Sequence, residues 1–95
     1  NQIINSVPES YFLGQNYPNP FNPDTKISFG IPGSGVVKIK VFDVSGRIIS
    51  VILDKYLTAG SYVVDFDGGN YSSGIYFYKI ENDNFIETKK MILLK

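Results

Sequence analysis

The sequence predicts an all-β fold, an antiparallel β-sandwich of about seven strands. Three observations support this prediction. Apolar residues recur with the period of two that is typical of half-buried strands. Turn-forming residues interrupt the alternation about every dozen positions, which leaves no room for crossover helices. The chain has 95 residues, 43% of them hydrophobic, which is enough for one core and one domain.

The predicted strands are rich in β-branched and aromatic residues, which fit a pleated surface better than a helix. In the stretch VVKIKVF, Val37, Ile39 and Val41 share the face that we expect to meet the core, while the two lysines between them face water. The predicted strands lie at 25–31, 36–42, 47–53, 61–66, 74–80 and 85–94, and residues 11–14 are a candidate for a further one.

The connections between these runs contain glycine, asparagine or aspartate, the residues that most readily adopt positive φ. Their sequences are PGSG at 32–35, DVSG at 43–46, TAG at 58–60, DGGN at 67–70 and ENDN at 81–84. Strand and turn therefore alternate throughout the second, longer part of the chain.

Charge and residue usage exclude several classes of function. Nine Lys and Arg residues balance nine Asp and Glu residues, so no overall field favours nucleic acid or an anionic membrane surface as a partner. The chain has no Cys and no His, which excludes thiolate nucleophiles, His-based triads and zinc sites of the Cys or His type. We therefore expect a monomer that is not an enzyme and has no catalytic residue, metal, cofactor or small-molecule substrate.

Two groups of side chains have a candidate binding role and a structural alternative. Asp65 and Asp67 are two positions apart, so on a strand they face the same way at ~7 Å, a spacing that suits a carboxylate pair or calcium ligands. The sequence DFDGGN lacks the full calcium-loop pattern, so we favour turn formation. Four tyrosines are candidates for a sugar-stacking platform, but core or cross-strand positions explain them better. They are Tyr62, Tyr71, Tyr76 and Tyr78.

A proline-rich segment with the sequence QNYPNPFNP precedes the first long predicted strand. Each proline removes a main-chain donor and biases the residue before it to extended geometry. We therefore predict a polyproline-like chain with turns at its asparagines over 17–23, packed along a sandwich edge with Tyr17 and Phe21 as apolar anchors. A peptide ligand for another binding module is the alternative. The predicted edge-covering residues are Asn16, Tyr17, Pro18, Asn19, Pro20, Phe21, Asn22 and Pro23.

The end of the chain, 88–95, contains three lysines, no acidic side chain and a run of apolar residues at 91–94. A strand that is apolar on both faces is usually buried on both, which favours burial in the chain's own sandwich. A last strand is also easily displaced, and its main chain can be offered to the sheet edge of a receptor. The residues alone leave both roles open.

Several unusual strings occur together and in a fixed order along residues 11–95. They are YFLGQNYPNPFNPDTKISFGIP, VKIKVFDVSGRII, AGSYVVDFDG, SSGIYFYKI and KKMILLK. On these strings the chain resembles the type A C-terminal sorting domains of type IX secretion. The resemblance implies an immunoglobulin-like sandwich that ends a larger exported protein of Bacteroidetes-type bacteria. Phe66 stands where many members have Trp, and the loop DGGNYSSG is shorter than usual; both departures affect packing rather than the terminal motif.

The resemblance also implies partners, a location and a division of the chain. Such domains address their cargo to an outer-membrane secretion translocon, and a sortase-type protease commonly removes them, leaving the cargo secreted or at the cell surface. Residues 1–10 are then a linker from upstream cargo that holds or follows the cut, and 11–95 are the sorting domain. Recognition is expected at Lys90, Met91, Ile92, Leu93, Leu94 and Lys95. The alternative function is a non-catalytic spacer or carbohydrate-binding module of an extracellular enzyme.

Overall fold

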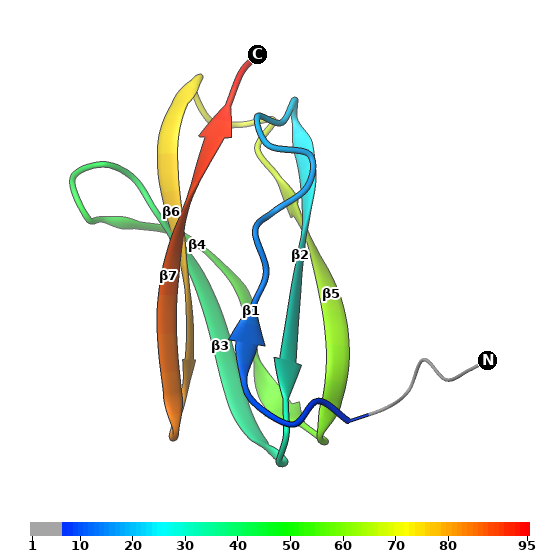
Figure 1. Ribbon diagram of the computed structural model, residues 1–95. Helices are drawn as coiled ribbons and strands as arrows, with labels where there is room; N and C mark the ends of the chain where they lie inside the picture. Colours follow the sequence, from blue (N-terminus) through cyan, green and yellow to red (C-terminus); the bar gives the residue numbers. More distant parts are fainter. Residues whose placement is uncertain (1–6) are drawn as a thin grey trace.

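A computed structural model describes residues 7–95, and this part of the chain is built from strands (Figure 1). The strands are β1 (Phe12–Leu13), β2 (Asp24–Ile31), β3 (Gly35–Phe42), β4 (Ile48–Leu57), β5 (Gly60–Asp67), β6 (Gly74–Asn82) and β7 (Phe85–Leu93). Over these residues there is no helix long and apolar enough to cross a membrane. The all-β prediction is confirmed, and 11–14 does supply a strand. Part of the expected linker, 1–6, lies outside the described residues.

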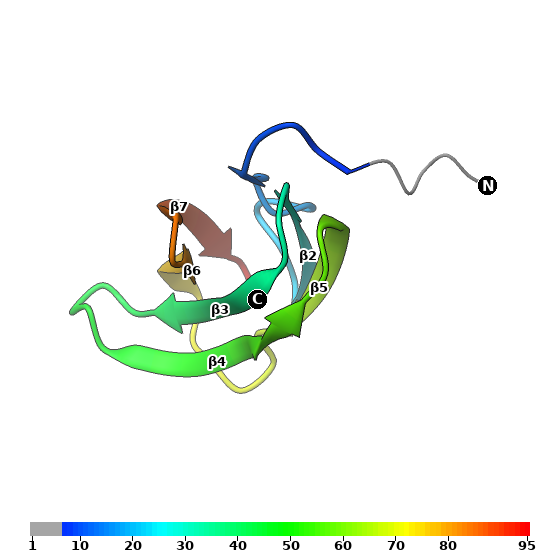
Figure 2. The same ribbon diagram turned by 90° about the horizontal axis from the view of Figure 1, so that it is seen from below.

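The strands form two antiparallel sheets that pack face to face (Figure 2). One sheet has the order β1-β2-β5 and the other has the order β4-β3-β6-β7. Hairpins join β3 to β4 and β6 to β7, whereas β2 pairs with β5, and β3 with β6, across longer stretches of sequence. These crossovers produce the sandwich of immunoglobulin-like type that the sequence and the resemblance predict.

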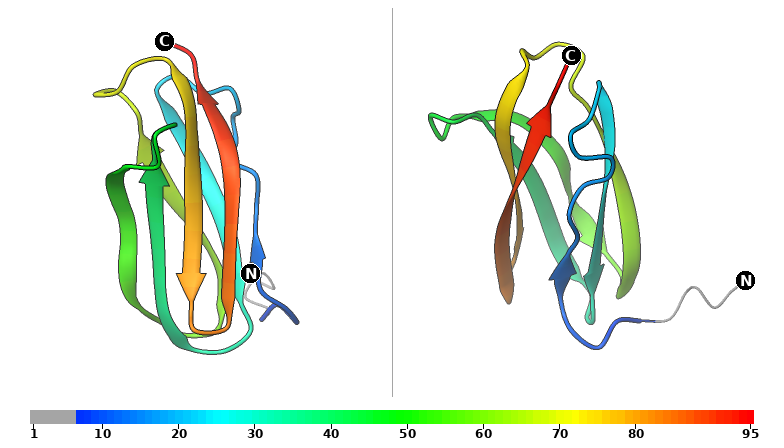
Figure 3. Two further views of the ribbon diagram at one scale, coloured as in Figure 1. Left: turned by 90° about the vertical axis from the view of Figure 1, so that its left-hand side faces the viewer. Right: turned by 45° about the horizontal axis from the view of Figure 1, so that its top comes forward.

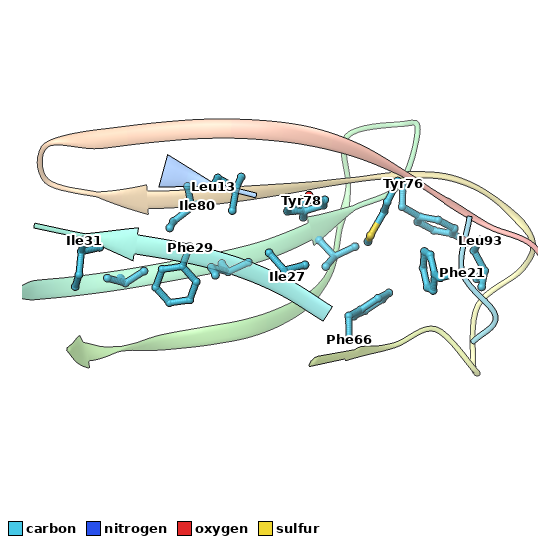
Figure 4. Close-up of a cluster of buried hydrophobic side chains, with 14 residues drawn as sticks. Leu13, Phe21, Ile27, Phe29, Ile31, Phe66, Tyr76, Tyr78, Ile80 and Leu93 are labelled. Carbon is cyan, nitrogen blue, oxygen red and sulfur yellow. The ribbon is translucent and has the colours of Figure 1, made fainter. Parts of the chain in front are cut away.

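The core lies between the sheets and uses one face of each inner strand (Figure 4). Val37, Ile39 and Val41 of β3 are fully buried, as their alternation predicts, and so are Ile27 and Phe29 of β2. Each such side chain contributes roughly 1.5–3 kcal/mol by leaving water. The other core residues are Leu13, Phe21, Ile31, Phe66, Tyr76, Tyr78, Ile80, Met91 and Leu93.

β4 is an edge strand that departs from the regular pattern. Its register with β3 shifts just before Lys40 and again just before Phe42, and none of its residues is fully buried. The strand also continues to Leu57, beyond the predicted range 47–53. The prediction stopped early because Asp54 and its neighbour Lys55 break the apolar alternation at a position where an edge strand is still paired.

The turn between β3 and β4 is built around Asp43. Its Oδ1 accepts hydrogen bonds from the main-chain N of Ser45 (2.9 Å) and of Arg47 (3.1 Å), and from Ser45 Oγ (2.6 Å). The hydrogen bond from Ser45 Oγ is the main cause that lowers the pKa of the Asp43 carboxyl below its usual range. Gly46 has φ of 88°, in the left-handed region that favours glycine, as the DVSG sequence predicts.

Candidate functional site

The first part of the proline-rich segment lies along the outer edge of β2. The Gly14 N–H donates to the Ser28 carbonyl at 2.7 Å, and the main chains of Tyr17 and Lys26 exchange two hydrogen bonds of 2.9 Å. The other edge of β2 is occupied by β5. Because an open strand edge is a template for pairing with other chains, these bonds protect β2 from such pairing.

The second part of the segment crosses to the other sheet and bonds to the outer edge of β7 (Figure 3). The Ile92 N–H donates to Asn19 Oδ1 at 3.0 Å. The Phe21 N–H donates to the Ile92 carbonyl at 2.9 Å, and the Leu94 N–H donates to the Phe21 carbonyl at 3.0 Å. The proline-rich segment and the end of the chain, which are far apart in the sequence, are therefore neighbours in space.

Two details of the predicted segment are wrong. It does not follow a single sandwich edge, because the chain bends at 18–20 and again at 22–23. A straight chain along one edge would not bond to β2 and β7, which belong to different sheets. Tyr17 is not an apolar anchor but is 80% exposed, because it stands opposite Lys26 and shares its solvent-facing side of the sheet. Phe21 is 1% exposed and lies in the core.

A buried polar cluster joins this segment to the core. The Asn16 N–H donates to the Tyr78 hydroxyl at 2.8 Å, and that hydroxyl donates to the Gly14 carbonyl at 2.6 Å. Asn16 Nδ2 donates to Thr25 Oγ1 (3.0 Å) and to the Pro18 carbonyl (3.1 Å). Burial raises the pKa of Tyr78 to about 12, although the Asn16 N–H opposes the shift. Sequence reasoning counted Tyr78 only as a core ring and missed the role of its hydroxyl.

The residues at the end of β7 divide by the direction of their side chains. Met91 and Leu93 point into the sandwich and are fully buried. Lys90 and Leu94 are exposed on the outer face of the sheet, and Ile92 is half-buried there. Burial in the chain's own core therefore accounts for only some of these side chains, and the main-chain edge beside Ile92 is already bonded to the proline-rich segment.

The last residue is attached to the short loop between β5 and β6. The Lys95 N–H donates to Ser73 Oγ at 2.9 Å. Its ammonium donates to the carbonyls of Gly69 (2.7 Å) and Tyr71 (3.0 Å). This loop thus receives the side chain of the last residue of the terminal motif.

The structure favours the turn interpretation for Asp67, whereas Asp65 lies within β5 opposite Lys26. The Asp65 carboxylate forms an ion pair with Lys26 at 2.6 Å, and Asp67 Oδ1 accepts the Gly69 N–H at 2.8 Å as a turn residue does. Among residues 7–95, no group of three or more His, Cys, Asp or Glu is placed to hold a metal ion.

The four candidate sugar-stacking tyrosines do not form a platform. Tyr76 and Tyr78 are buried, and Tyr62 and Tyr71 are half-buried against the core. Each of the four hydroxyls donates to a main-chain carbonyl. These rings serve packing, which is the interpretation that the sequence favoured.

A family model for secretion system C-terminal sorting domains matches residues 15–94, a range that contains both the proline-rich segment and nearly all of the terminal motif. The chain belongs to this family. The resemblance to the sorting domains of type IX secretion is thereby confirmed. No curated protein and no solved structure matches the chain.

Membership of the sorting-domain family carries several consequences. A sorting domain of type IX secretion marks its protein for export across the outer membrane, so the protein is secreted or lies at the cell surface. It implies a cargo upstream and contact with the secretion machinery. Domains of this family are non-catalytic in general, and a Bacteroidetes source is consistent with them.

Proposed function

We propose that residues 11–95 are the C-terminal address of a larger protein, recognised by the outer-membrane translocon through Lys90, Met91, Ile92, Leu93, Leu94 and Lys95. Residues 1–10 connect this domain to the cargo. The observation that carries the proposal is the family match, which covers the terminal motif as far as Leu94. The placement of the two ends supports it. The described part of the chain enters the sandwich at one end, just before β1, and leaves it at the opposite end, after β7, so the segment that leads to the cargo and the address lie at different ends (Figure 1).

We further propose that a sortase-type protease cuts within or before 1–10. Proteases need an extended and accessible backbone, and such sites are found at exposed chain segments outside regular structure. Within the described residues, Val7, Glu9 and Ser10 are exposed and belong to no strand. A cut here leaves the sandwich whole, whereas a cut within β2 to β7 would break one of the sheets.

A fused reporter tests both parts of the proposal in a bacterium with a type IX system. A reporter joined before Asn1 should reach the medium or the surface, and deletion of 91–95 should abolish export. The fragment released into the medium, measured by mass spectrometry, should begin at or before residue 11. A cut inside 26–94 would refute the cleavage proposal. Full export of the deletion variant, with its domain still folded by circular dichroism, would favour the spacer-module function instead.

A further inference from the structure

The end of β7 has two faces and two edges, and only one of the four is open. One edge is paired with β6. Its inner side chains, Met91 and Leu93, are fully buried. Its other main-chain edge is bonded along its length: Gln15 Nε2 donates to the Lys90 carbonyl at 2.8 Å, and the Ile92 N–H and carbonyl are both bonded to the proline-rich segment. A receptor strand therefore finds no free donor or acceptor at Ile92 while this segment is in place. The outer face of the sheet is the side that remains accessible.

That outer face carries a continuous apolar patch that spans three strands. Ile92 stands opposite Ile75, and Lys90 stands opposite Phe77, which in turn pairs with a phenylalanine of β3. Ile75 is 42% exposed and Leu94 is 53% exposed. We call this surface the terminal patch; it consists of Phe42, Ile75, Phe77, Lys90, Ile92 and Leu94.

Positive charge borders the terminal patch. The Lys79 ammonium lies 5.3 Å from the centre of the Phe42 ring. Lys79 also approaches Glu81 at 3.8 Å, whereas Lys90 has no ion pair within residues 7–95. An apolar surface with an unpaired lysine at its rim is complementary to a protein that offers apolar side chains together with a carboxylate.

We infer that the secretion machinery reads the end of this chain through the terminal patch, with the proline-rich segment still in place, and not by adding a strand to β7. The partner is a protein whose contact surface has an apolar centre and an acidic rim. This inference rests on the proposed function. It divides the terminal motif into two sets of side chains. Met91 and Leu93 stabilise the fold, whereas Lys90, Ile92 and Leu94 contact the partner.

The first test changes the patch and leaves the core intact. The double variant Ile75→Thr/Ile92→Thr keeps β-branched residues in two paired strands and removes apolar surface. The matched control, Val36→Thr/Ile86→Thr, removes exposed apolar surface from the opposite end of the same sheet face, where these side chains are 48% and 66% exposed. Loss of two central apolar contacts should reduce export of a fused reporter roughly tenfold or more. The control should export at the wild-type level.

Charge reversal gives a second, independent measure of the same surface. Lys90→Glu should reduce export at least about fivefold if a carboxylate of the partner faces this position. The control, Lys55→Glu, changes an exposed lysine of β4 and should have no effect. Export is compared only among variants whose melting temperature equals that of the wild type. Folded patch variants that export as well as the wild type would overturn the inference.

A disulfide tests whether the start of the proline-rich segment must leave β2 during recognition. Tyr17 and Lys26 form a hydrogen-bonded antiparallel pair with exposed side chains, a geometry with Cα atoms ~5.5 Å apart that fits a disulfide. The chain has no Cys, so Tyr17→Cys/Lys26→Cys introduces the sole pair. The oxidised double variant should export as well as either single variant. Export that fails in the oxidised double variant alone would show that the segment has to be released from β2, and would overturn the inference that it stays in place.

The same experiments separate this inference from the proposed function and from a lipid partner. If the wild-type domain exports no more reporter than a reporter without it, the proposed function itself fails. Vesicles of phosphatidylglycerol should not bind the wild-type chain in a sedimentation assay. Binding that Ile75→Thr/Ile92→Thr abolishes would assign the terminal patch to an anionic lipid surface and overturn the protein partner.

Discussion

The two halves of β7 solve the problem of an exposed strand edge in different ways. In the first half, Phe85–Lys89, β7 pairs with β6 on one side, and within residues 7–95 no strand pairs with it on the other. Glu87 and Lys89 there point toward the inside of the sandwich and form an ion pair of 3.3 Å. In the second half, Lys90–Leu93, the inner side chains are aliphatic or Met and the proline-rich segment covers the edge.

This difference shows how one short terminal motif can both stabilise the fold and serve as the proposed recognition signal. Charged side chains that point inward discourage edge-to-edge association but contribute little to a core. A covering segment permits full burial of the inner side chains, because water and foreign strands are both excluded. The half of β7 that we propose as part of the address is therefore the half with the buried inner face.

The largest expected effect comes from the buried side of the second half. Leu93→Ala removes a fully buried side chain and should lower the free energy of unfolding by about 2–5 kcal/mol. Ile86→Ala, at a position 66% exposed in the first half, should change it by no more than about 0.5 kcal/mol. Urea denaturation of both variants measures the contrast. Equal losses would show that the two halves do not differ in packing.

High pH should lower the free energy of unfolding through Tyr78, which stands opposite Lys89 at the boundary between the two halves. Desolvation raises the pKa of Tyr78 to about 12 from its usual value of 10.0, so the folded state favours the neutral phenol. Its contribution is fully present below pH 10 and is lost as the pH rises from 10 to 12, because only the unfolded chain ionises readily in that window. The loss should reach roughly 2–3 kcal/mol. Absorbance near the phenolate band should show one tyrosine that titrates last, and this late step should be missing in Tyr78→Phe.

Tyr78→Phe should also destabilise the chain at neutral pH. It leaves the Gly14 carbonyl and the Asn16 N–H without the hydroxyl that bonds to both, at a cost of about 1–3 kcal/mol. Thermal unfolding at pH 7 measures the loss. A variant as stable as the wild type would mean that water replaces the hydroxyl and that the cluster is not closed to solvent.

A smaller effect is expected where Asn19 covers the edge of β7. Asn19→Ala frees the Ile92 N–H and should cost about 0.5–1.5 kcal/mol, with faster amide exchange at Ile92 and Leu94. Asn19→Asp keeps an oxygen acceptor at this position and should retain slow exchange. If the Ile92 amide exchanges as fast in the wild type as in Asn19→Ala, the proline-rich segment does not protect the edge of β7 in solution.

The smallest effect is expected on the outer face. Lys90 is exposed and has no ion pair among residues 7–95, so Lys90→Ala should change the free energy of unfolding by no more than about 0.5 kcal/mol. Urea denaturation checks this value. A loss of about 2 kcal/mol or more would equal that of truncating a buried side chain. It would show that Lys90 contributes to packing and that the inner and outer side chains of the second half do not differ in this respect.

Much of the fold follows from local pattern, and much of the site does not. Period-two alternation predicts β2 and β3 because each has one uniformly buried face. The same rule fails for Tyr17 and Phe21, which are both aromatic and both next to prolines, since their exposure depends on which strand, β2 or β7, each one bonds to. The Tyr78 hydroxyl is a similar case: its partners lie 62 and 64 positions away, and no local signal identifies them.

The bonds between the proline-rich segment and β7 also bear on the order in which the chain folds. Gln15 and Lys90 are 75 positions apart, and Asn19 and Ile92 are 73 apart, so these contacts have high sequence separation. The hairpins β3–β4 and β6–β7 need only short loops and can form before them. Until these distant contacts form, β7 presents an unpaired edge, whereas the pairing of Tyr17 with Lys26 that covers β2 is local and can form earlier. A partly folded chain therefore has a surface for aggregation at β7 that closes late.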